Sequence, residues 1–203
     1  MIEGLRFEQD FLTPEEEQAL IGIIAGLPLA AAEYHQYTAR RRVVSYGYRY
    51  DFERSELLGA QPLPESLQPL RARVAAWAAL APDAIAHVLV SEYAPGTQLG
   101  WHRDVPEFEE VFGVSLGSPA RLRLRPWPHT PNVPGARGRV RVLPLEPRSI
   151  YQLRGPARWG WQHSVPPVPA LRWSITLRTR RPQRDPAAPE HPTGAQRGRT
   201  SIR

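Results

Sequence analysis

His102 and Asp104 are the first residues of this chain whose types and spacing suggest chemistry. They end a segment that has the pattern of a strand, a turn at Pro95-Gly96 and a second short strand. Side chains two positions apart in an extended chain point to the same face, with about 6.6 Å of backbone between them. The imidazole and the carboxylate can therefore approach one metal ion from the same side, and His163 is the candidate third ligand. Two histidines and one carboxylate with open positions are typical of a non-haem Fe(II) site that uses O₂.

A second segment supports this interpretation, although a His-x-Asp pair alone would equally fit a solvated surface. Residues 172–178 alternate strictly between polar and apolar side chains, as in a half-buried strand. One face would carry Trp173, Ile175 and Leu177, and the other Arg172, Ser174, Thr176 and Arg178. A surface strand would also show polar residues outward. Two arginines separated by small hydroxyl groups could instead bind a dicarboxylate, because each guanidinium can donate two parallel hydrogen bonds to a carboxylate.

Four motifs, in their order along the chain, resemble those of the AlkB family of 2-oxoglutarate- and Fe(II)-dependent dioxygenases. They are Tyr93-Ala94-Pro95-Gly96, His102-x-Asp104, His163 and Arg172-x-Ser174-x-Thr176-x-Arg178, within a resemblance that covers roughly residues 1–180. The resemblance implies Fe(II) as the metal, 2-oxoglutarate as the cosubstrate and O₂ as the oxidant. It also implies a reaction that converts 2-oxoglutarate and O₂ to succinate and CO₂ while a C–H bond of the substrate is hydroxylated.

The resemblance assigns the three metal ligands named above and a set of cosubstrate residues. That set is Tyr93, Arg172, Ser174, Arg178 and Ser91. Arg172, helped by Tyr93, would hold the C5 carboxylate of 2-oxoglutarate, because a buried carboxylate needs a buried cation. Arg178 would lie near Asp104 and the C1 end. Geometry alone does not decide which arginine takes which end.

Two positions depart from the pattern of the DNA-repair members. Ser91 stands where those enzymes typically carry Asn, which makes it a shorter partner for the cosubstrate. Pro106 stands where they commonly carry a second acid that contacts the alkylated, cationic base. Either Glu107 takes over that contact or the substrate differs.

A run of basic and aromatic residues from Arg40 to Phe52 is the candidate substrate lid. On one continuous strand Val44 and three tyrosines would share a face. The proposed lid residues are Arg41, Arg42, Tyr46, Tyr48 and Tyr50. The tyrosine face could simply pack on the core. Alternatively, it could stack a base, at about 1–3 kcal/mol per base, while the arginines neutralise phosphate.

Two helices and many short strands must position these residues. Thr13-Pro14-Glu15-Glu16 predicts a capped helix start, and a second amphipathic helix is expected from about Pro69 to Ala81, after a loop at 53–64. Short strands are expected at 5–7, 114–116, 121–125, 139–143, 149–153 and 159–163. Short strands separated by Pro and Gly turns favour a jelly roll. We therefore expect a mainly β protein with flanking helices (α+β) and a double-stranded β-helix (jelly-roll) core.

We expect one dioxygenase domain over residues 1–181 and a disordered basic tail over 182–203. Within the domain, residues 1–87 would form an N-terminal extension with helices and lid, and 88–181 the jelly-roll core. All 26 basic residues are Arg. Six of them and only two of the 20 acids lie from residue 180 onward, so residues 1–179 carry a net charge of only +2 out of +6.

The composition narrows the kinds of metal site and the cellular locations that the chain can have. The chain has no Cys, which excludes disulfides and thiolate metal sites. No apolar run approaches the roughly 20 residues that span a bilayer, and no signal-peptide pattern is present. We therefore expect a cytoplasmic protein without membrane partners, and a monomer.

The expected function is oxidative demethylation of N-alkylated nucleobases in DNA or RNA, as in alkylation repair, with a nucleic acid as substrate. Hydroxylation or demethylation of a protein side chain or a small metabolite would keep the metal and cosubstrate residues without needing the lid. A non-catalytic jelly-roll binding module would lack a metal ligand. The identity of the lesion, and the choice of DNA or RNA, do not follow from the sequence.

Overall fold

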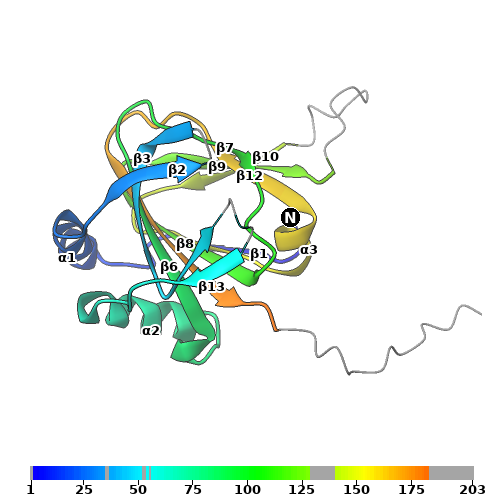
Figure 1. Cartoon of the computed structure of the whole chain (residues 1–203). Coiled ribbons are helices and arrows are strands. Elements are labelled where there is room, and N and C mark those ends of the chain that lie inside the picture. Colours follow the sequence, from blue (N-terminus) through cyan, green and yellow to red (C-terminus); the bar gives the residue numbers. More distant parts are fainter. Residues whose placement is uncertain (1, 35–36, 52–53, 55, 129–139, 183–203) are drawn as a thin grey trace, which may run out of the picture.

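Two antiparallel sheets face each other in this computed structural model, which describes residues 2–34, 37–51, 54, 56–128 and 140–182 (Figure 1). The larger sheet has seven strands in the order β1-β11-β8-β13-β6-β3-β2, and the smaller has four in the order β10-β9-β12-β7. This arrangement confirms the mainly β, jelly-roll architecture that the sequence predicts. None of the helices in the described part of the chain is long and apolar enough to cross a membrane.

The strand boundaries follow the alternating segments of the sequence. The larger sheet contains β1 (Leu5–Glu8), β2 (Ala30–Tyr34), β3 (Tyr37–Tyr46), β6 (Ile85–Tyr93), β8 (Phe108–Gly117), β11 (Ile150–Leu153) and β13 (Arg172–Arg180). The smaller sheet contains β7 (Leu99–His102), β9 (Ala120–Pro126), β10 (Arg141–Leu145) and β12 (Trp161–Val165). The expected strand at residues 159–163 begins later, because the short helix α3 (Gly155–Trp159) precedes it, with Pro156 in its first turn.

The first helix, α1 (Pro14–Ala25), begins as the sequence predicts. The Thr13 side chain accepts a hydrogen bond from the Glu16 amide, and the Glu16 side chain accepts one from the Thr13 amide. This reciprocal capping box satisfies two backbone donors that helix geometry leaves without partners. The helix buries Leu20 and Ile24 against the larger sheet, and Gly26 caps its end.

The second helix, α2 (Gln68–Trp77), follows the short 3₁₀ helix η1 (Glu65–Leu67) and ends four residues earlier than expected. Ala79 adopts a positive φ of 57°, and its amide bonds to the Ala76 carbonyl while the Leu80 amide reaches the Ala75 carbonyl. These two bonds form a Schellman motif. The left-handed turn ends the helix and lets Leu80 pack against the core as a separate contact.

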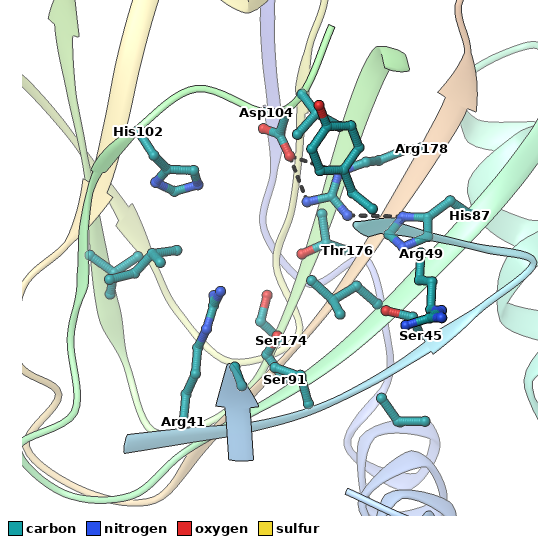
Figure 2. Close-up of a pocket in the computed structure, with 18 of the residues that line it drawn as sticks. Arg41, Ser45, Arg49, His87, Ser91, His102, Asp104, Ser174, Thr176 and Arg178 are labelled. Atoms are coloured by element: carbon teal, nitrogen blue, oxygen red, sulfur yellow. Dashed lines mark hydrogen bonds and ion pairs between the residues drawn. The ribbon is translucent and has the colours of Figure 1, made fainter. Parts of the chain in front are cut away.

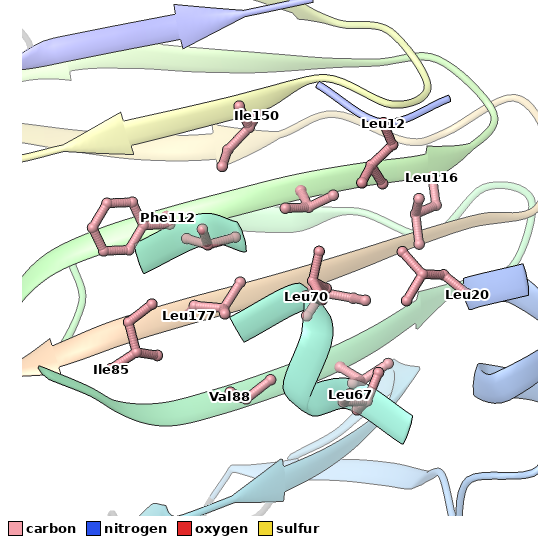
Figure 3. Close-up of a cluster of buried hydrophobic side chains, with 14 of the residues drawn as sticks. Leu12, Leu20, Leu67, Leu70, Ile85, Val88, Phe112, Leu116, Ile150 and Leu177 are labelled. Carbon is pink, nitrogen blue, oxygen red and sulfur yellow. The ribbon is translucent and has the colours of Figure 1, made fainter. Parts of the chain in front are cut away.

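Two hydrophobic clusters stabilise the fold. One lies between the helices and the outer face of the larger sheet, where Leu67 and Leu70 pack over β6, β8 and β13 (Figure 3). The other lies on the facing sides of the two sheets and includes Val111, Leu122, Leu124 and Val165. Since the helices cover the outer face, the opposite face of the larger sheet, which carries Arg172, is left facing the smaller sheet.

The prediction of one continuous strand with three tyrosines on the same face is wrong, because the chain changes sheets at Gly47. The strand β3 ends at Tyr46, and β4 (Tyr48–Asp51) pairs instead with β5 (Glu56–Gly59) in a separate ribbon. Gly47 has a φ of 79°, and a Cβ atom there would lie 2.1 Å from the Ala86 carbonyl oxygen, so only glycine fits this turn. The ribbon also replaces part of the loop that we expected at residues 53–64.

The N-terminal extension is not a separate layer. Its strands β1 and β2 form the two edges of the larger sheet, and β3 pairs directly with β6. The predicted boundary at residues 87 and 88 falls inside β6, and the division into an extension and a core stays a prediction. Residues 183–203, most of the predicted tail, lie outside the described residues.

Candidate metal centre and cosubstrate pocket

A cavity of about 1040 Å³ opens between the two sheets. Side chains from β3, β4, β6 and β13 line one part of it, and side chains from β7 and β12 line another. Figure 2 shows the polar residues of the cavity, with His102 on one side, Ser174 and Thr176 on the other, and Asp104 in contact with Arg178. The two motifs that the sequence analysis singled out therefore meet in one space.

Strand pairing brings the three predicted metal ligands together. His102 ends β7, Asp104 follows two residues later, and His163 lies in β12 directly opposite His102 in the register of the two strands. The two imidazole rings are 4.2 Å apart between centroids. One potential ligand atom from each of the three residues lies within 4.8 Å of the others, a spacing that could hold a metal ion.

The protonation states of these groups suit a divalent cation. Burial alone would raise the pKa of Asp104, but the positive charge of Arg178 outweighs this effect and holds that pKa well below its usual value. Burial lowers the pKa of His163 to about 3, assisted by His102, and burial also lowers the pKa of His102. The site thus presents one carboxylate and two neutral imidazoles, the forms that bind metal.

Arg178 contacts only one of the two carboxylate oxygens of Asp104. Arg178 donates through Nε (2.7 Å) and Nη2 (2.6 Å) to Oδ1. The other oxygen, Oδ2, is buried and has no hydrogen-bond partner among the described residues, although His163 Nε2 lies 3.4 Å away. A buried carboxylate oxygen without a donor is costly, and a bound Fe(II) would satisfy it.

Arg172 is a buried cation whose hydrogen-bond donors are only partly used. Its side chain is 2% exposed, stacks over the Tyr93 ring at 5.0 Å and donates from Nη2 to the Ser115 hydroxyl at 3.3 Å. Among the described residues, its Nε and Nη1 groups have no hydrogen-bond partner, and no acidic residue forms an ion pair with Arg172. A buried guanidinium with two unused donors fits a ligand carboxylate, because only an anion can compensate its desolvation.

The register of β13 with β6 completes this part of the cavity. Arg172 lies opposite Tyr93, and Ser174 lies opposite Ser91. The predicted alternation of β13 is correct: Ile175 and Leu177 enter the core. The polar side chains of the other face line the cavity, namely Arg172, Ser174, Thr176 and Arg178.

The predicted lid residues separate into two groups. Arg41 and Tyr50 line the cavity. Arg42 points away and pairs with Glu92 at 3.1 Å, as expected for the neighbour of Arg41 on a strand. Tyr46 is buried in the helix-covered core, and the Tyr48 hydroxyl accepts a hydrogen bond from Arg180 outside the cavity. The structure therefore does not bring Arg42, Tyr46 and Tyr48 into the pocket.

His87, to which the sequence analysis assigns no role, also lines the cavity. Its Nδ1 lies 3.0 Å from Arg178 Nη1, and its ring stacks on Phe108 with centroids 4.8 Å apart. Burial lowers its pKa well below 6.5, so the imidazole is neutral and can accept this hydrogen bond. The sequence could have indicated this position. His87 lies an even number of residues from Ser91 and Tyr93 on one strand, so the three side chains point to the same face.

Arg158 is a second residue that the sequence analysis missed. It is 2% exposed, and its Nη2 donates to the carbonyls of Asp104 (3.1 Å), Val105 (2.8 Å) and Phe108 (3.0 Å). The guanidinium therefore fixes the loop that presents the Asp104 carboxylate. No sequence pattern indicates this role, since its partners are backbone atoms about 50 residues away.

The fold and this site are those of a known class of oxidative enzymes. A sequence profile of the 2OG-Fe(II) oxygenase superfamily matches residues 4–183, so the chain belongs to that superfamily. The protein is a 2-oxoglutarate-dependent Fe(II) dioxygenase, with Fe(II), 2-oxoglutarate and O₂ as its cofactors. Within the superfamily, the comparisons below confirm the resemblance to the AlkB family.

Individual relatives are similar to this chain and carry AlkB-type names. The chain is 29% identical over 188 residues to the "Alkylated DNA repair protein ALKBH8 homolog" of Arabidopsis thaliana, covering 81% of this chain and 51% of that protein. It is 26% identical over 170 residues to the "tRNA (carboxymethyluridine(34)-5-O)-methyltransferase alkbh8" of Xenopus tropicalis, covering 81% of this chain and 25% of that protein. The chain thus spans about half or less of these two relatives.

A solved structure shares the fold. The structure described as OsALKBH1 superposes with a TM-score of 0.66 at 17% identity, over 87% of this chain and 96% of that one. At this level of identity the similarity establishes the jelly-roll fold, and the site residues of this chain rest on their own geometry.

Proposed function

We propose that this dioxygenase oxidises an N-alkyl group on a nucleobase of DNA or RNA and thereby removes it. The observation that carries the proposal is that one cavity contains both the unpartnered Asp104 Oδ2 and the unpartnered donors of Arg172. One is suited to a metal ion and the other to a cosubstrate carboxylate. The rest of the cavity is then available to a substrate.

Each residue has a defined part in this proposal. His102, Asp104 and His163 bind Fe(II), and Arg172, stacked on Tyr93, binds the C5 carboxylate of 2-oxoglutarate. Arg178 fixes the orientation of Asp104 and lies near the C1 end of the cosubstrate, while Ser91 and Ser174 complete the cosubstrate wall. When bound, these cofactors supply the oxidation, in which one oxygen atom of O₂ enters a substrate C–H bond and the other enters succinate as CO₂ is released.

The substrate chemistry then requires little from the protein. Hydroxylation of an N-methyl group gives an N-hydroxymethyl group, which loses formaldehyde and leaves an N–H bond. The protein must exclude water and hold the alkyl group near the metal. The walls of the cavity combine apolar side chains with Tyr50 and Trp101, whose rings are suited to contact with a flat base.

Two further observations support a nucleic acid as the partner. The names of the two relatives described above refer to nucleic acid, DNA in one and tRNA in the other. The four-stranded sheet, all of whose residues are described, carries four arginines on β9 and β10 and no acidic residue. Arg123 and Arg125 stack on Trp101, which also lines the cavity. Such a surface complements a phosphate backbone.

The test is coupled product formation with Fe(II), 2-oxoglutarate and a panel of single-stranded oligonucleotides that carry one N-methylated base. We expect succinate and formaldehyde in equal amounts, and neither product above background with the unmethylated oligonucleotide. The His163→Ala variant should be inactive while keeping the wild-type circular dichroism spectrum. Turnover of a protein extract or a small metabolite, but of no oligonucleotide, would contradict the proposal and favour hydroxylation of a protein or a metabolite.

The cytoplasmic location and the monomeric state expected from the sequence remain predictions. Sedimentation of the purified protein at several concentrations would test the second of them.

A further inference from the structure

The outer face of the four-stranded sheet carries a set of arginine and tryptophan side chains. On β9, Leu122 and Leu124 enter the space between the sheets, so the alternation of the strand turns the arginines beside them outward. Strand pairing extends this face to β12, where Ser164 lies opposite Arg123. We call the following set the Arg–Trp face: Trp101, Arg103, Arg121, Arg123, Arg125 and Trp127.

Stacking contacts join this set across the sheet. The Arg125 guanidinium lies over the Trp101 ring at 4.4 Å, and that of Arg123 lies over the same ring at 5.1 Å. In the opposite direction, Arg103, which follows β7, lies over the ring of Trp127, which follows β9, at 4.7 Å. Trp101 and Arg103 also line the cavity. The Arg–Trp face therefore reaches the mouth of the proposed active site.

The positive charges of this face lack acidic partners. None of the four strands of the sheet contains an acidic residue, and within the described residues none of the four arginines of the face forms an ion pair. Arg123 and Arg125 donate from Nε to neutral groups, the Ser164 hydroxyl at 3.1 Å and the Gln162 side-chain oxygen at 2.8 Å. Burial, together with the nearby charge of Arg123, lowers the pKa of Arg125. A bound anion would relieve this repulsion.

Exposed aromatic and apolar area accompanies the charge. Trp127 is 42% exposed, and Val142, which pairs with Arg123 on the same face, is 54% exposed. Helices α1 and α2 pack on the larger sheet instead, and Figure 1 shows the four-stranded sheet on the side of the molecule away from α2. Arg141, the remaining arginine of the sheet, pairs with Leu124 and belongs to its other side. The face thus offers both flat rings and unpaired positive charge to a partner.

We propose that the Arg–Trp face binds the single-stranded polynucleotide that continues from a base held in the cavity. The choice of partner rests on the proposed function. Arginines attract phosphate by charge, and indole rings and guanidinium planes are both surfaces on which unpaired bases stack. A duplex hides the faces of its bases, and an acidic peptide would use the charge and leave the rings unused. Because Trp101 and Arg103 belong to the face and to the cavity wall, one strand can contact both.

Binding without turnover tests the face directly. The metal-free full-length protein is titrated into a labelled unmethylated single strand of about ten nucleotides, and fluorescence anisotropy gives the Kd at several salt concentrations. Arg121→Gln/Arg125→Gln should weaken binding and reduce the slope of log Kd against log salt by about 1.4, because each phosphate contact of a single strand contributes about 0.7. Only differences between variants are compared, since other arginines of the chain also attract phosphate.

The matched control removes the same charge elsewhere. Arg71 lies on α2 and Arg154 directly before α3, so neither belongs to the four-stranded sheet. Arg71→Gln/Arg154→Gln should leave the slope unchanged. Thermal unfolding at the wild-type temperature shows that each variant is folded.

A second pair of variants separates stacking from charge. Trp127→Leu should weaken binding of the single strand by about fivefold or more, as expected for the loss of one stacked base, whereas Trp127→Phe should retain most of the affinity. Heparin, a polyanion without bases, should bind the wild type and Trp127→Leu equally well. A duplex of the same sequence should bind the wild type less tightly than the single strand does.

Turnover connects the face with the cavity. One N-methylated base is placed in a trinucleotide or in the middle of the longer strand, and the ratio of the two kcat/KM values is measured. In the wild type the longer strand should be favoured by about tenfold or more, because contacts at two sites of one molecule reinforce each other. The ratio should fall in Arg121→Gln/Arg125→Gln, through KM more than through kcat.

The outcomes separate the two proposals. If Arg121→Gln/Arg125→Gln behaves like the control pair, or if Trp127→Leu weakens heparin and the single strand alike, the inference is wrong, and oxidation of the methylated trinucleotide shows that the proposed function stands. Self-association that Arg121→Gln/Arg125→Gln abolishes, without any loss of single-strand binding, would assign the face to a second copy of the chain and also overturn the inference. If the wild type binds single strands as expected but oxidises neither methylated substrate, the proposed function fails while the binding surface is supported.

Discussion

The two imidazoles of the proposed metal site lie where burial keeps them neutral, and this has a consequence for acid stability. Burial lowers the pKa of His163 to about 3 in the folded metal-free protein, whereas its ordinary pKa of 6.5 applies in the unfolded chain. Between these values the unfolded state binds more protons, so acid favours unfolding. The stabilising contribution is fully present above about pH 6.5 and is lost as the pH falls toward 3.

We therefore expect the metal-free wild type to lose more stability than His163→Gln when the pH is lowered from about 7.5 to about 5. Glutamine is neutral at both values and contributes no such dependence. Urea denaturation with a chelator present gives the free energy of unfolding at each pH. Equal losses in the two proteins would show that His163 is not held neutral by burial.

Arg172 is the residue on which cosubstrate binding should depend most. Arg172→Lys keeps the charge but loses the planar fork, so the affinity for 2-oxoglutarate should fall. Arg172→Ala should fall further, by an amount on the order of the 3–5 kcal/mol associated with breaking a buried ion pair. Calorimetric titration of the Mn(II)-loaded protein measures both. Arg180→Lys, on the exposed end of the same strand, is the control, and a wild-type affinity in Arg172→Ala would refute the assignment.

Strand parity explains which of these residues the sequence could reveal. Alternation correctly placed Arg172, Ser174 and Arg178 on one face, because a strand has a period of two whatever surrounds it. The same rule would have placed His87 in the cavity, because His87 shares a strand face with Ser91 and Tyr93. The role of Arg158 was not predictable, since it depends on backbone atoms of a distant loop.

At the scale of elements, helix α1 is joined to the larger sheet by a buried polar contact in addition to its apolar face. Glu17 is buried, and its Oε1 accepts a hydrogen bond from the Gly117 amide at 2.8 Å. Its Oε2 lies 3.5 Å from Arg148 Nη1. The helix is thereby tied to the end of β8, whose strand pairs directly with β13.

Glu17→Ala should destabilise the fold by about 1–3 kcal/mol, because the partly buried Gly117 amide would lose its acceptor. Glu17→Gln keeps an acceptor oxygen and should cost less. Chemical denaturation compares the two variants with the wild type. If alanine and glutamine were equally tolerated, the Gly117 contact would not be a stabilising one.

The break at Gly47 shows where pattern-based prediction of elements reaches its limit. The alternation of tyrosines continues across the glycine, so the sequence predicts one strand where the structure has two strands in different sheets. Glycine within a strand pattern can mark a bend, but nothing local determines which neighbour the chain then pairs with. That choice depends on the contact of Gly47 with Ala86, a residue distant in sequence.

At the scale of the whole molecule, the metal-free protein retains two buried ionic groups whose partners are incomplete. Asp104 Oδ2 and the Nε and Nη1 groups of Arg172 lack hydrogen bonds in the described structure. Ligands that satisfy these atoms bind the folded state and not the unfolded one. Their binding must therefore raise the stability of the entire domain.

We expect Mn(II) and 2-oxoglutarate together to raise the Tm clearly. At about 100 times the Kd, one ligand contributes roughly 2.7 kcal/mol, which corresponds to about 5–10 °C for a domain of this size. Differential scanning calorimetry measures the shift. Arg172→Ala should keep the metal-dependent part and lose the 2-oxoglutarate-dependent part, and a full response in that variant would contradict the proposed division.

The ribbon of β4 and β5 has a consequence for how such an enzyme diversifies. It contributes Arg49, Tyr50 and Gly59 to the cavity wall but supplies no strand to either large sheet. Backbone hydrogen bonds at Gly47, to Gln61 and from Ala60, close its base. Mutations, insertions or recombination within the ribbon can therefore accumulate without disturbing the strands that hold the iron ligands. Substrate preference can then change at a different evolutionary rate from the oxidative chemistry, within the walls of one cavity.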